Sequence, residues 1–188
     1  MLISIDGIDG SGKSTQVRLL AEALGAQIIQ EISPSKWGKL MRSTENPTLG
    51  QQIAWFTADR AQLSETLAEA SGSAERHIVT DRSYLSSVGY QSFDSPLSPE
   101  LLEDIGLALM PPYDLQIVMG IPVDVALQRV ESRGEKKTWC ENPQLLTHAA
   151  AVFDRWAETR NGIVQVNADQ SIEAVHRDVM AAVAQVES

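Results

Sequence analysis

Residues 7–14 combine glycines, a lysine and a serine at a spacing that suits phosphate chemistry. They read G-I-D-G-S-G-K-S, a full match to the phosphate-loop pattern G-x-x-x-x-G-K-[ST]. Glycines let successive backbone N–H groups turn toward a phosphate, and a following helix adds unpaired N–H donors. Lys13 would reach the β and γ phosphates, and the Ser14 hydroxyl would complete a Mg²⁺ shell. The motif predicts ATP contacts from Gly7, Asp9, Gly10, Ser11, Gly12, Lys13, Ser14 and Thr15.

The residues on both sides of this motif favour the same interpretation. Residues 2–5 form a short apolar stretch typical of a buried strand, and apolar residues then recur at helical spacing until Gly25. Strand, glycine loop and helix is the order that the motif requires. The alternative, a glycine-rich turn with a surface lysine, is disfavoured by this context.

A second polar pair, Asp81 and Arg82, directly follows the predicted strand 77–80. Ligands of α/β sheets gather at the carboxyl ends of the strands. Asp81 could hold Mg²⁺ together with Ser14, and Arg82 could clamp a phosphoryl group. Taken alone, the pair is equally compatible with a strand-capping aspartate and a solvated arginine.

Apolar segments along the chain alternate with predicted helices, which supplies a scaffold for these residues. This alternation predicts an α/β protein with a mainly parallel sheet and helices on both faces. The predicted strands are residues 2–5, 27–30, 77–80, 115–119 and 162–166. Helices are predicted from Pro47 to about Ala70, from Ser98-Pro99-Glu100 onward, from Pro122 towards Arg133, and from Ser171.

Length, composition and charge limit the possible functions. A chain of 188 residues suits one domain, and a net charge of −10 argues against a nucleic-acid surface. No apolar run approaches membrane-spanning length, and no signal peptide is recognisable, so no membrane partner is expected. The single cysteine, Cys140, fits a reducing compartment, which predicts a cytoplasmic protein.

Three longer motifs carry a resemblance to a known family. Residues 81–91 read D-R-S-Y-L-S-S-V-G-Y-Q, residues 56–62 read F-T-A-D-R-A-Q, and residues 112–117 with 123–129 contain a Y-D-L strand and a V-x-x-A-L-x-R helix. In order and spacing they resemble the thymidylate kinase family of P-loop nucleoside monophosphate kinases. The resemblance implies a three-layer P-loop NTPase fold with a five-stranded parallel sheet, one kinase domain over residues 1–188, nucleotide substrates and a homodimer.

The resemblance also implies acceptor-binding roles for matched residues. Phe56 would stack on the acceptor base, and Arg60, on the same helix face, would hydrogen-bond the edge of that base. Asp9 would meet the 3′-hydroxyl of the acceptor sugar. From residue type alone, Phe56 would be a core residue, Arg60 a solvated charge and Asp9 the centre of an Asx turn.

Four further positions would complete the acceptor site. Arg82 would hold the acceptor phosphate, Ser86 and Ser87 would lie near the base, and Tyr90 would lie near C2′, where its ring would exclude ribose. A helix-surface position is the alternative for the two serines, and a core aromatic is the alternative for Tyr90.

A basic segment at about residues 133–142 is the candidate lid. Family members that lack an arginine in the phosphate loop carry the catalytic cation in this lid, and the present chain has Gly10 in the loop. Lys136 or Lys137 would assist, although a solvated loop is the alternative for both lysines. The implied catalytic residues are Lys13, Arg82 and Arg133.

Three segments depart from the family pattern. Residues 30–35 read Q-E-I-S-P-S where the family has R-E-P-G-G-T, Ser83 replaces a tyrosine, and Lys137 and Cys140 replace acidic residues of the lid. All three departures lie on the acceptor or lid side, whereas the ATP side is intact. Cys140 is expected to be inert.

The expected reaction is therefore transfer of the γ-phosphoryl group of Mg-ATP to a deoxynucleoside monophosphate, with dTMP giving dTDP. A kinase for another or modified nucleotide, or for a nucleoside, is one alternative. A nucleotide-dependent switch or ATPase without an acceptor is the other.

Overall fold

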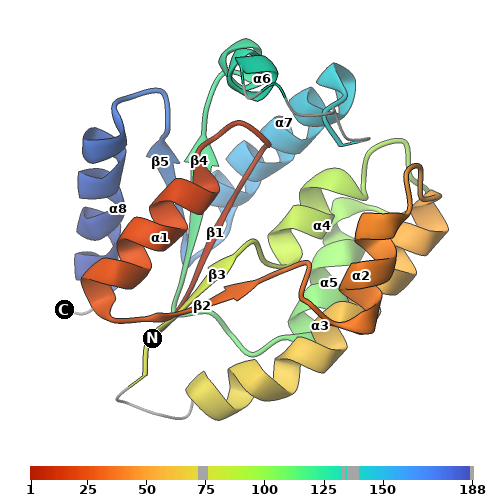
Figure 1. Cartoon of the computed structure of the whole chain (residues 1–188), viewed down its shortest axis with the longest axis horizontal. Helices are drawn as coiled ribbons and strands as arrows, with labels where there is room; N and C mark the ends of the chain where they lie inside the picture. The colour runs from red at the N-terminus through yellow and green to blue at the C-terminus, as the bar shows by residue number, and fades with distance from the viewer. Residues whose placement is uncertain (72–75, 133, 135–139, 187–188) are drawn as a thin grey trace.

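A five-stranded parallel sheet forms the centre of the protein (Figure 1). The computed structural model describes residues 1–71, 76–132, 134 and 140–186. The strand order is β2-β3-β1-β4-β5. The strands are β1 Leu2–Gly7, β2 Gln27–Gln30, β3 Ile78–Asp81, β4 Leu115–Gly120 and β5 Ile163–Asn167. All the predicted strands are confirmed, with ends that differ by one or two residues at most.

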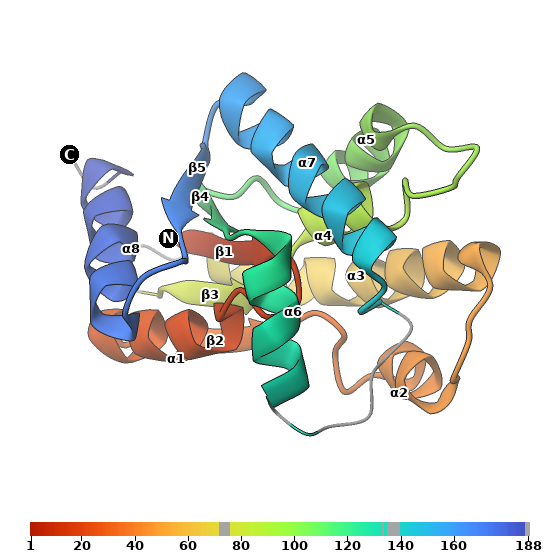
Figure 2. The same ribbon diagram turned by 90° about the horizontal axis from the view of Figure 1, so that it is seen from above.

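Helices cover both faces of this sheet. They are α1 Lys13–Leu24, α2 Lys36–Ser43, α3 Leu49–Ser71, α4 Tyr84–Tyr90, α5 Pro99–Leu109, α6 Val123–Ser132, α7 Pro143–Thr159 and α8 Ile172–Val186. Helices α1 and α8 pack together on one face, while α4 and α7 pack on the other (Figures 1 and 2). This is the three-layer α/β arrangement of the P-loop NTPases, as predicted.

Two hydrophobic clusters hold the layers together. The first joins the sheet to α1 and α8 and includes Ile5, Leu20 and Val179, each fully buried. The second joins the sheet to α4 and α7 and includes Leu85 and Trp156. Because the central strands are covered on both faces, their residues are almost continuously buried, as expected of a parallel sheet.

The strand register brings the candidate functional segments to one edge. Asp81 at the end of β3 pairs with Ile5 of β1 and with Gln30 of β2. The phosphate loop leaves β1 at the same edge, since Gly7 pairs with Met119 near the end of β4. The carboxyl ends of four neighbouring strands therefore meet where the sequence predicts ligand binding.

Helix ends follow the predicted signals. Gly25 ends α1 in the left-handed conformation with a φ of 60°, and the Ser98 hydroxyl caps α5 by accepting from the Leu101 N–H. Helices α2 and α7 were not predicted. Their capping residues, Ser35 and Asn142, accept hydrogen bonds from first-turn N–H groups. In the described part of the chain, none of the helices has the length and apolarity needed to cross a membrane.

Candidate active site

The phosphate loop connects β1 to α1 and requires glycine at two points. Gly10 and Gly12 have φ values of 89° and 90°, in the region that favours glycine. A Cβ on Gly10 would also lie 2.2 Å from the carbonyl oxygen of Ala126 in α6. This close packing leaves no space for an arginine at residue 10 of the phosphate loop.

The first turn of α1 is arranged to receive an anion. Its N-cap residue is Gly12, and no side chain caps the helix. The N–H groups of the first turn are thus not satisfied by a side chain of the cap, and they coincide with the positive end of the helix dipole. A phosphate is the ligand that suits this arrangement.

Lys13 is buried beside this helix start, with only 6% of its surface exposed. Its Nζ donates to the Ile8 carbonyl oxygen at 2.8 Å and lies 3.7 Å from Asp9 Oδ1. Burial, reinforced by Arg82, lowers the pKa of Lys13 to about 8, although nearby carboxylates oppose the shift. The alternative of a surface lysine is wrong.

Ser14 and Asp81 come together as the sequence predicts. The Ser14 hydroxyl donates to Asp81 Oδ2 at 2.9 Å, at the end of β3. A hydroxyl and one carboxylate fit Mg²⁺, which keeps several waters and takes further oxygens from the substrate phosphates. Among the described residues there is no cluster of three or more His, Cys, Asp or Glu side chains that would form an all-protein metal cage.

Arg82 has a strained backbone and several contacts at the centre of the site. Its φ is 76°, which is unusual for a residue with a side chain. The guanidinium pairs with Asp9 Oδ1 and lies over the Tyr90 ring, 5.6 Å from its centroid. Arg82 is therefore not the solvated arginine of the alternative interpretation.

Asp9 contacts two cationic side chains, those of Arg82 and Lys13, and the hydroxyl of Tyr90. Burial opposes ionisation of Asp9, but Arg82 and Lys13 outweigh it and hold the pKa of this carboxyl well below its usual range. The Tyr90 hydroxyl oxygen accepts a hydrogen bond from the Asp9 N–H at 3.0 Å. Burial also raises the pKa of Tyr90, so its phenol stays neutral.

Two adjoining cavities lie around these residues. The phosphate cavity has a volume of about 260 Å³. It is lined by Asp9, Gly10, Gly12, Lys13, Ser14, Thr15, Gln30, Glu31, Ile32, Asp81 and Arg82. The Phe56 pocket, of about 70 Å³, is lined by Asp9, Glu31, Ile32, Phe56, Arg82, Ser86, Tyr90, Gln91 and Cys140. The volume of the Phe56 pocket is smaller than the roughly 300–1,000 Å³ of typical ligand pockets, so some of its side chains would have to move to admit a nucleoside.

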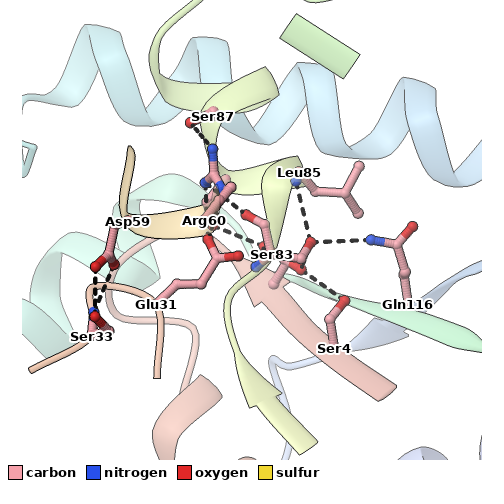
Figure 3. A network of polar contacts seen from close by, with 11 residues as sticks. Ser4, Glu31, Ser33, Asp59, Arg60, Ser83, Leu85, Ser87 and Gln116 are labelled. Atoms are coloured by element: carbon pink, nitrogen blue, oxygen red, sulfur yellow. Dashed lines mark hydrogen bonds and ion pairs between the residues drawn. The ribbon is translucent and has the colours of Figure 1, made fainter. Parts of the chain in front are cut away.

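Arg60 lies in a buried network next to the Phe56 pocket (Figure 3). Its Nε donates to Glu31 Oε2 at 2.9 Å, its Nη1 to Ser87 Oγ at 2.8 Å, and its Nη2 to the Ser83 carbonyl at 3.2 Å. Arg60 also lies 5.4 Å from the centroid of the Phe56 ring. The solvated-charge alternative is wrong, and Phe56 is half-buried at the pocket rather than in a core cluster.

Glu31 is a functional candidate that sequence reasoning did not identify. Burial raises its pKa even though Arg60 opposes the shift. It lines both cavities and holds Arg60, so it links the two halves of the site. It is the one residue that residues 30–35 share with the family pattern R-E-P-G-G-T at its position.

Asp6 is a second missed residue, fully buried at the end of β1. Its carboxylate accepts from the N–H and the hydroxyl of Ser83 and from the hydroxyls of Ser4 and Ser86. Ser86 and Ser87 are both buried, so the helix-surface alternative is wrong for them. A carboxylate within an apolar strand was the available signal.

A third cavity lies on the other side of the phosphate loop and has a volume of about 350 Å³. We call it the Arg129 cavity. It is lined by Gly10, Ser11, Gly12, Thr15, Gln16, Met119, Arg129, Ala168, Gln170, Ser171, Ile172 and Val175. Arg129 Nη1 donates to the Ala168 carbonyl at 3.1 Å, which holds the guanidinium at the wall of the cavity.

The predicted lid lies mostly outside the described residues. Arg133, Lys136 and Lys137 all belong to that part of the chain, so their roles stay predictions. Cys140 is described, and it lines the Phe56 pocket.

Comparisons with known proteins identify the family of this chain. The thymidylate kinase family model matches residues 5–179. A thymidylate kinase of Desulfotalea psychrophila is 31% identical, covering 98% of this chain and 95% of its own length. A probable thymidylate kinase of Thermococcus onnurineus is 32% identical, with 97% of each chain covered. A thymidylate kinase of Fervidobacterium nodosum is 28% identical, with 96% of each covered.

These matches run through both cavities, from the phosphate loop to the α4 segment. They confirm the predicted enzyme class, an ATP-dependent nucleoside monophosphate kinase. With a matching family model and relatives aligned over nearly their full length, the chain belongs to the thymidylate kinase family.

Proposed function

We propose that this protein transfers the γ-phosphoryl group of Mg-ATP to dTMP, giving ADP and dTDP. The observation that carries the proposal is the shared wall of the phosphate cavity and the Phe56 pocket. Asp9 and Arg82 line both, beside Lys13 on one side and Phe56 on the other. A phosphorus atom held between them would have a donor site and an acceptor site within reach.

The donor nucleotide spans the phosphate loop. Its phosphates occupy the phosphate cavity, where Lys13 and the first turn of α1 neutralise them. Its base occupies the Arg129 cavity. This cavity adjoins the phosphate cavity, because Gly10, Gly12 and Thr15 line both of them. The planar guanidinium of Arg129 suits stacking on an aromatic base.

The transfer is a displacement at phosphorus. A phosphate oxygen of dTMP forms a bond to the γ-phosphorus while the bond from that phosphorus to the β–γ bridging oxygen breaks, and ADP leaves. Positioning and charge neutralisation supply most of the catalysis in such reactions. Arg82 holds the acceptor phosphate, and Lys13 holds the donor phosphates. Mg²⁺, held through Ser14 and Asp81, would screen the charge of the β and γ phosphates.

The cation that acts on the transferred group itself is assigned to the lid. Gly10 cannot be replaced by an arginine without a clash with Ala126, so the phosphate loop cannot supply it. Arg133 is the proposed donor, with Lys136 or Lys137 assisting.

Acceptor selection follows from the chemistry of the Phe56 pocket. The Phe56 ring offers a stacking surface, and Tyr90 fills the space beside the sugar. Arg60 lies next to this pocket and not in its wall; its guanidinium carries hydrogen-bond donors and no acceptor, so it would recognise a carbonyl oxygen and reject an amino group at the same point. Thymine presents a carbonyl where cytosine presents an amino group.

An acceptor panel tests the proposal. Purified protein with Mg-ATP is offered dTMP, dUMP, dCMP, TMP with a ribose sugar, and thymidine, and the phosphorylated products are separated and quantified. We expect dTDP as the main product and little turnover of dCMP. Silence with dTMP but turnover of another nucleotide or nucleoside would favour the alternative acceptor, and ATP hydrolysis unaffected by every acceptor would favour a switch or ATPase.

The homodimer that the resemblance implies is proposed as well. Light scattering during gel filtration measures it directly, with an expected mass twice that of the chain. A mass equal to one chain would contradict it.

A further inference from the structure

We infer that Asp6 is a positioning residue for Arg82 and so for the phosphoryl transfer described above. Asp6 lies at the end of β1, fully buried, and lines neither the phosphate cavity nor the Phe56 pocket. It therefore acts through other residues. The effect on kcat that we expect rests on the proposed function. The effect on the conformation of Arg82 rests only on the geometry of the site.

The carboxylate of Asp6 ties β1 to the start of α4. Asp6 Oδ1 accepts from the Ser83 N–H at 2.9 Å and from the Ser86 hydroxyl at 2.8 Å. Asp6 Oδ2 accepts from the Ser83 hydroxyl at 2.7 Å and from the Ser4 hydroxyl at 3.0 Å. These four contacts give each oxygen of the Asp6 side chain two hydrogen-bond partners.

The hydroxyl of Ser83 is fixed in direction by its other partners. It accepts from the Leu85 N–H at 3.2 Å and from Gln116 Nε2 at 3.1 Å, which leaves its own hydrogen for Asp6. Figure 3 shows the bonds that reach Ser83 from Leu85 and Gln116. Ser83 is fully buried, and its small side chain, which stands where the family pattern has a tyrosine, fits beside Asp6.

Arg82 is held on both sides by these anchors. Its own N–H donates to the Ile5 carbonyl at 3.1 Å, and the next residue, Ser83, is fixed by Asp6. Between them the chain adopts a φ of 76° at Arg82. A strained conformation of this kind persists only when its surroundings enforce it. The conformation directs the guanidinium to Asp9, at the wall that the two cavities share.

Asp6 consequently affects the transfer step more than the binding of ATP. If the hydrogen bonds between Asp6 and Ser83 are weakened, Ser83 can shift and the backbone of Arg82 can relax out of the left-handed region. A displacement of about 1 Å in a positioning group can cost on the order of 10²-fold in rate. The hydrogen bonds of Asp6 go to Ser4, Ser83 and Ser86, none of which belongs to the phosphate loop, so ATP affinity should change little.

The test is a double-mutant cycle with Asp6→Asn and Arg82→Ala. Asp6→Asn keeps the side-chain volume and replaces one acceptor oxygen with an amide N–H donor. We expect it to lower kcat with dTMP by roughly 10- to 100-fold, with the KM for ATP within about twofold of wild type. In the Arg82→Ala background the same change should have almost no further effect, because its target is gone.

A matched control is available in Asp59→Asn. Asp59 is also buried and also accepts from serine groups, those of Ser33 and Ser35, but it holds a different loop. The fold-reduction in kcat caused by Asp59→Asn should multiply with the fold-reduction caused by Arg82→Ala when the two changes are combined. If the Asp6→Asn effect multiplied in the same way, Asp6 would be merely structural and the inference would be overturned.

A crystal structure of the Asp6→Asn protein separates this inference from the proposed function. We expect Arg82 to have left the left-handed region or its contact with Asp9. An unchanged Arg82 would overturn the inference whatever the acceptor is. If the wild-type protein failed to phosphorylate dTMP, the proposed function would be contradicted. The crystal structure of the Asp6→Asn protein would then still decide whether Asp6 positions Arg82.

Discussion

The phosphate loop and the Phe56 pocket lie at the same edge of the sheet but are assembled differently. The loop takes its binding groups from residues 7–15, many of them backbone N–H groups. The pocket collects side chains from the phosphate loop, from the segments that follow β2 and β3, from α3 and α4, and from Cys140. Buried carboxylates stabilise these side chains. Glu31, for example, lines the pocket and forms an ion pair with Arg60.

This difference determines how each region responds to change. The loop is local, so one residue can be removed with a defined chemical loss. The pocket is a network of contacts between residues far apart in the chain, so support residues that touch no substrate still influence it.

The largest effect is expected in the loop, from Lys13→Ala. The buried ammonium is lost and no described side chain replaces it, so turnover should fall by about 10³-fold or more. Steady-state kinetics measures the loss, and circular dichroism checks that the fold is retained. The exposed residue Lys39 provides the control, since Lys39→Ala should leave turnover unchanged. Retained activity in Lys13→Ala would remove the phosphate loop from the mechanism.

A smaller effect is expected where the two regions meet, from Arg82→Lys. The positive charge remains, but the planar fork that can hold two phosphate oxygens is lost. We expect kcat to fall on the order of 10²-fold, with a smaller rise in the KM for dTMP. Arg18→Lys, on an exposed part of α1, is the matched control. Equal kinetics for the two variants would argue against a role for Arg82 in transfer.

The Phe56→Ala variant tests the acceptor region alone. Stacking of a base on an aromatic ring contributes about 1–3 kcal/mol, or roughly 5- to 150-fold in affinity. The KM for dTMP should rise within that range while the KM for ATP stays constant. Phe93 contacts His148 outside the pocket, so Phe93→Ala controls for the loss of a half-buried ring. An unchanged KM for dTMP in Phe56→Ala would return this residue to a packing role.

The smallest effect is a pH dependence of the loop. The pKa of Lys13 is lowered to about 8, so the ammonium is charged at pH 7 and mostly neutral at pH 9. ATP binding favours the charged form and should weaken as the pH rises through 8, by about tenfold at pH 9. Isothermal titration calorimetry in two buffers should also detect proton uptake on binding at that pH. An ATP affinity that is constant between pH 7 and 9 would contradict this assignment.

The same contrast explains what the sequence could predict. The phosphate loop, the Ser14–Asp81 pair and the strands are encoded in short segments or in strand order, and all were predicted. Helices α2 and α7 have capping signals at Ser35 and Asn142 that were overlooked. A closer search for N-caps would have found both.

The support of the Phe56 pocket could not be predicted in this way. Asp6 and Ser83 are 77 positions apart, and no local pattern indicates that they are hydrogen-bonded. Helical spacing placed Phe56 and Arg60 on one face but could not decide whether that face was solvated. The burial of Arg60 depends on Glu31 and Ser87, which come from other elements.

The most direct test of the account is the binding of a single molecule that joins adenosine and thymidine through a chain of five phosphates. If the two regions face each other across Asp9 and Arg82, this molecule should compete with both ATP and dTMP. It should also bind far more tightly than either, because the second contact becomes intramolecular. Displacement of ATP alone, with dTMP binding unaffected, would contradict the claim that one phosphoryl group passes between these sites.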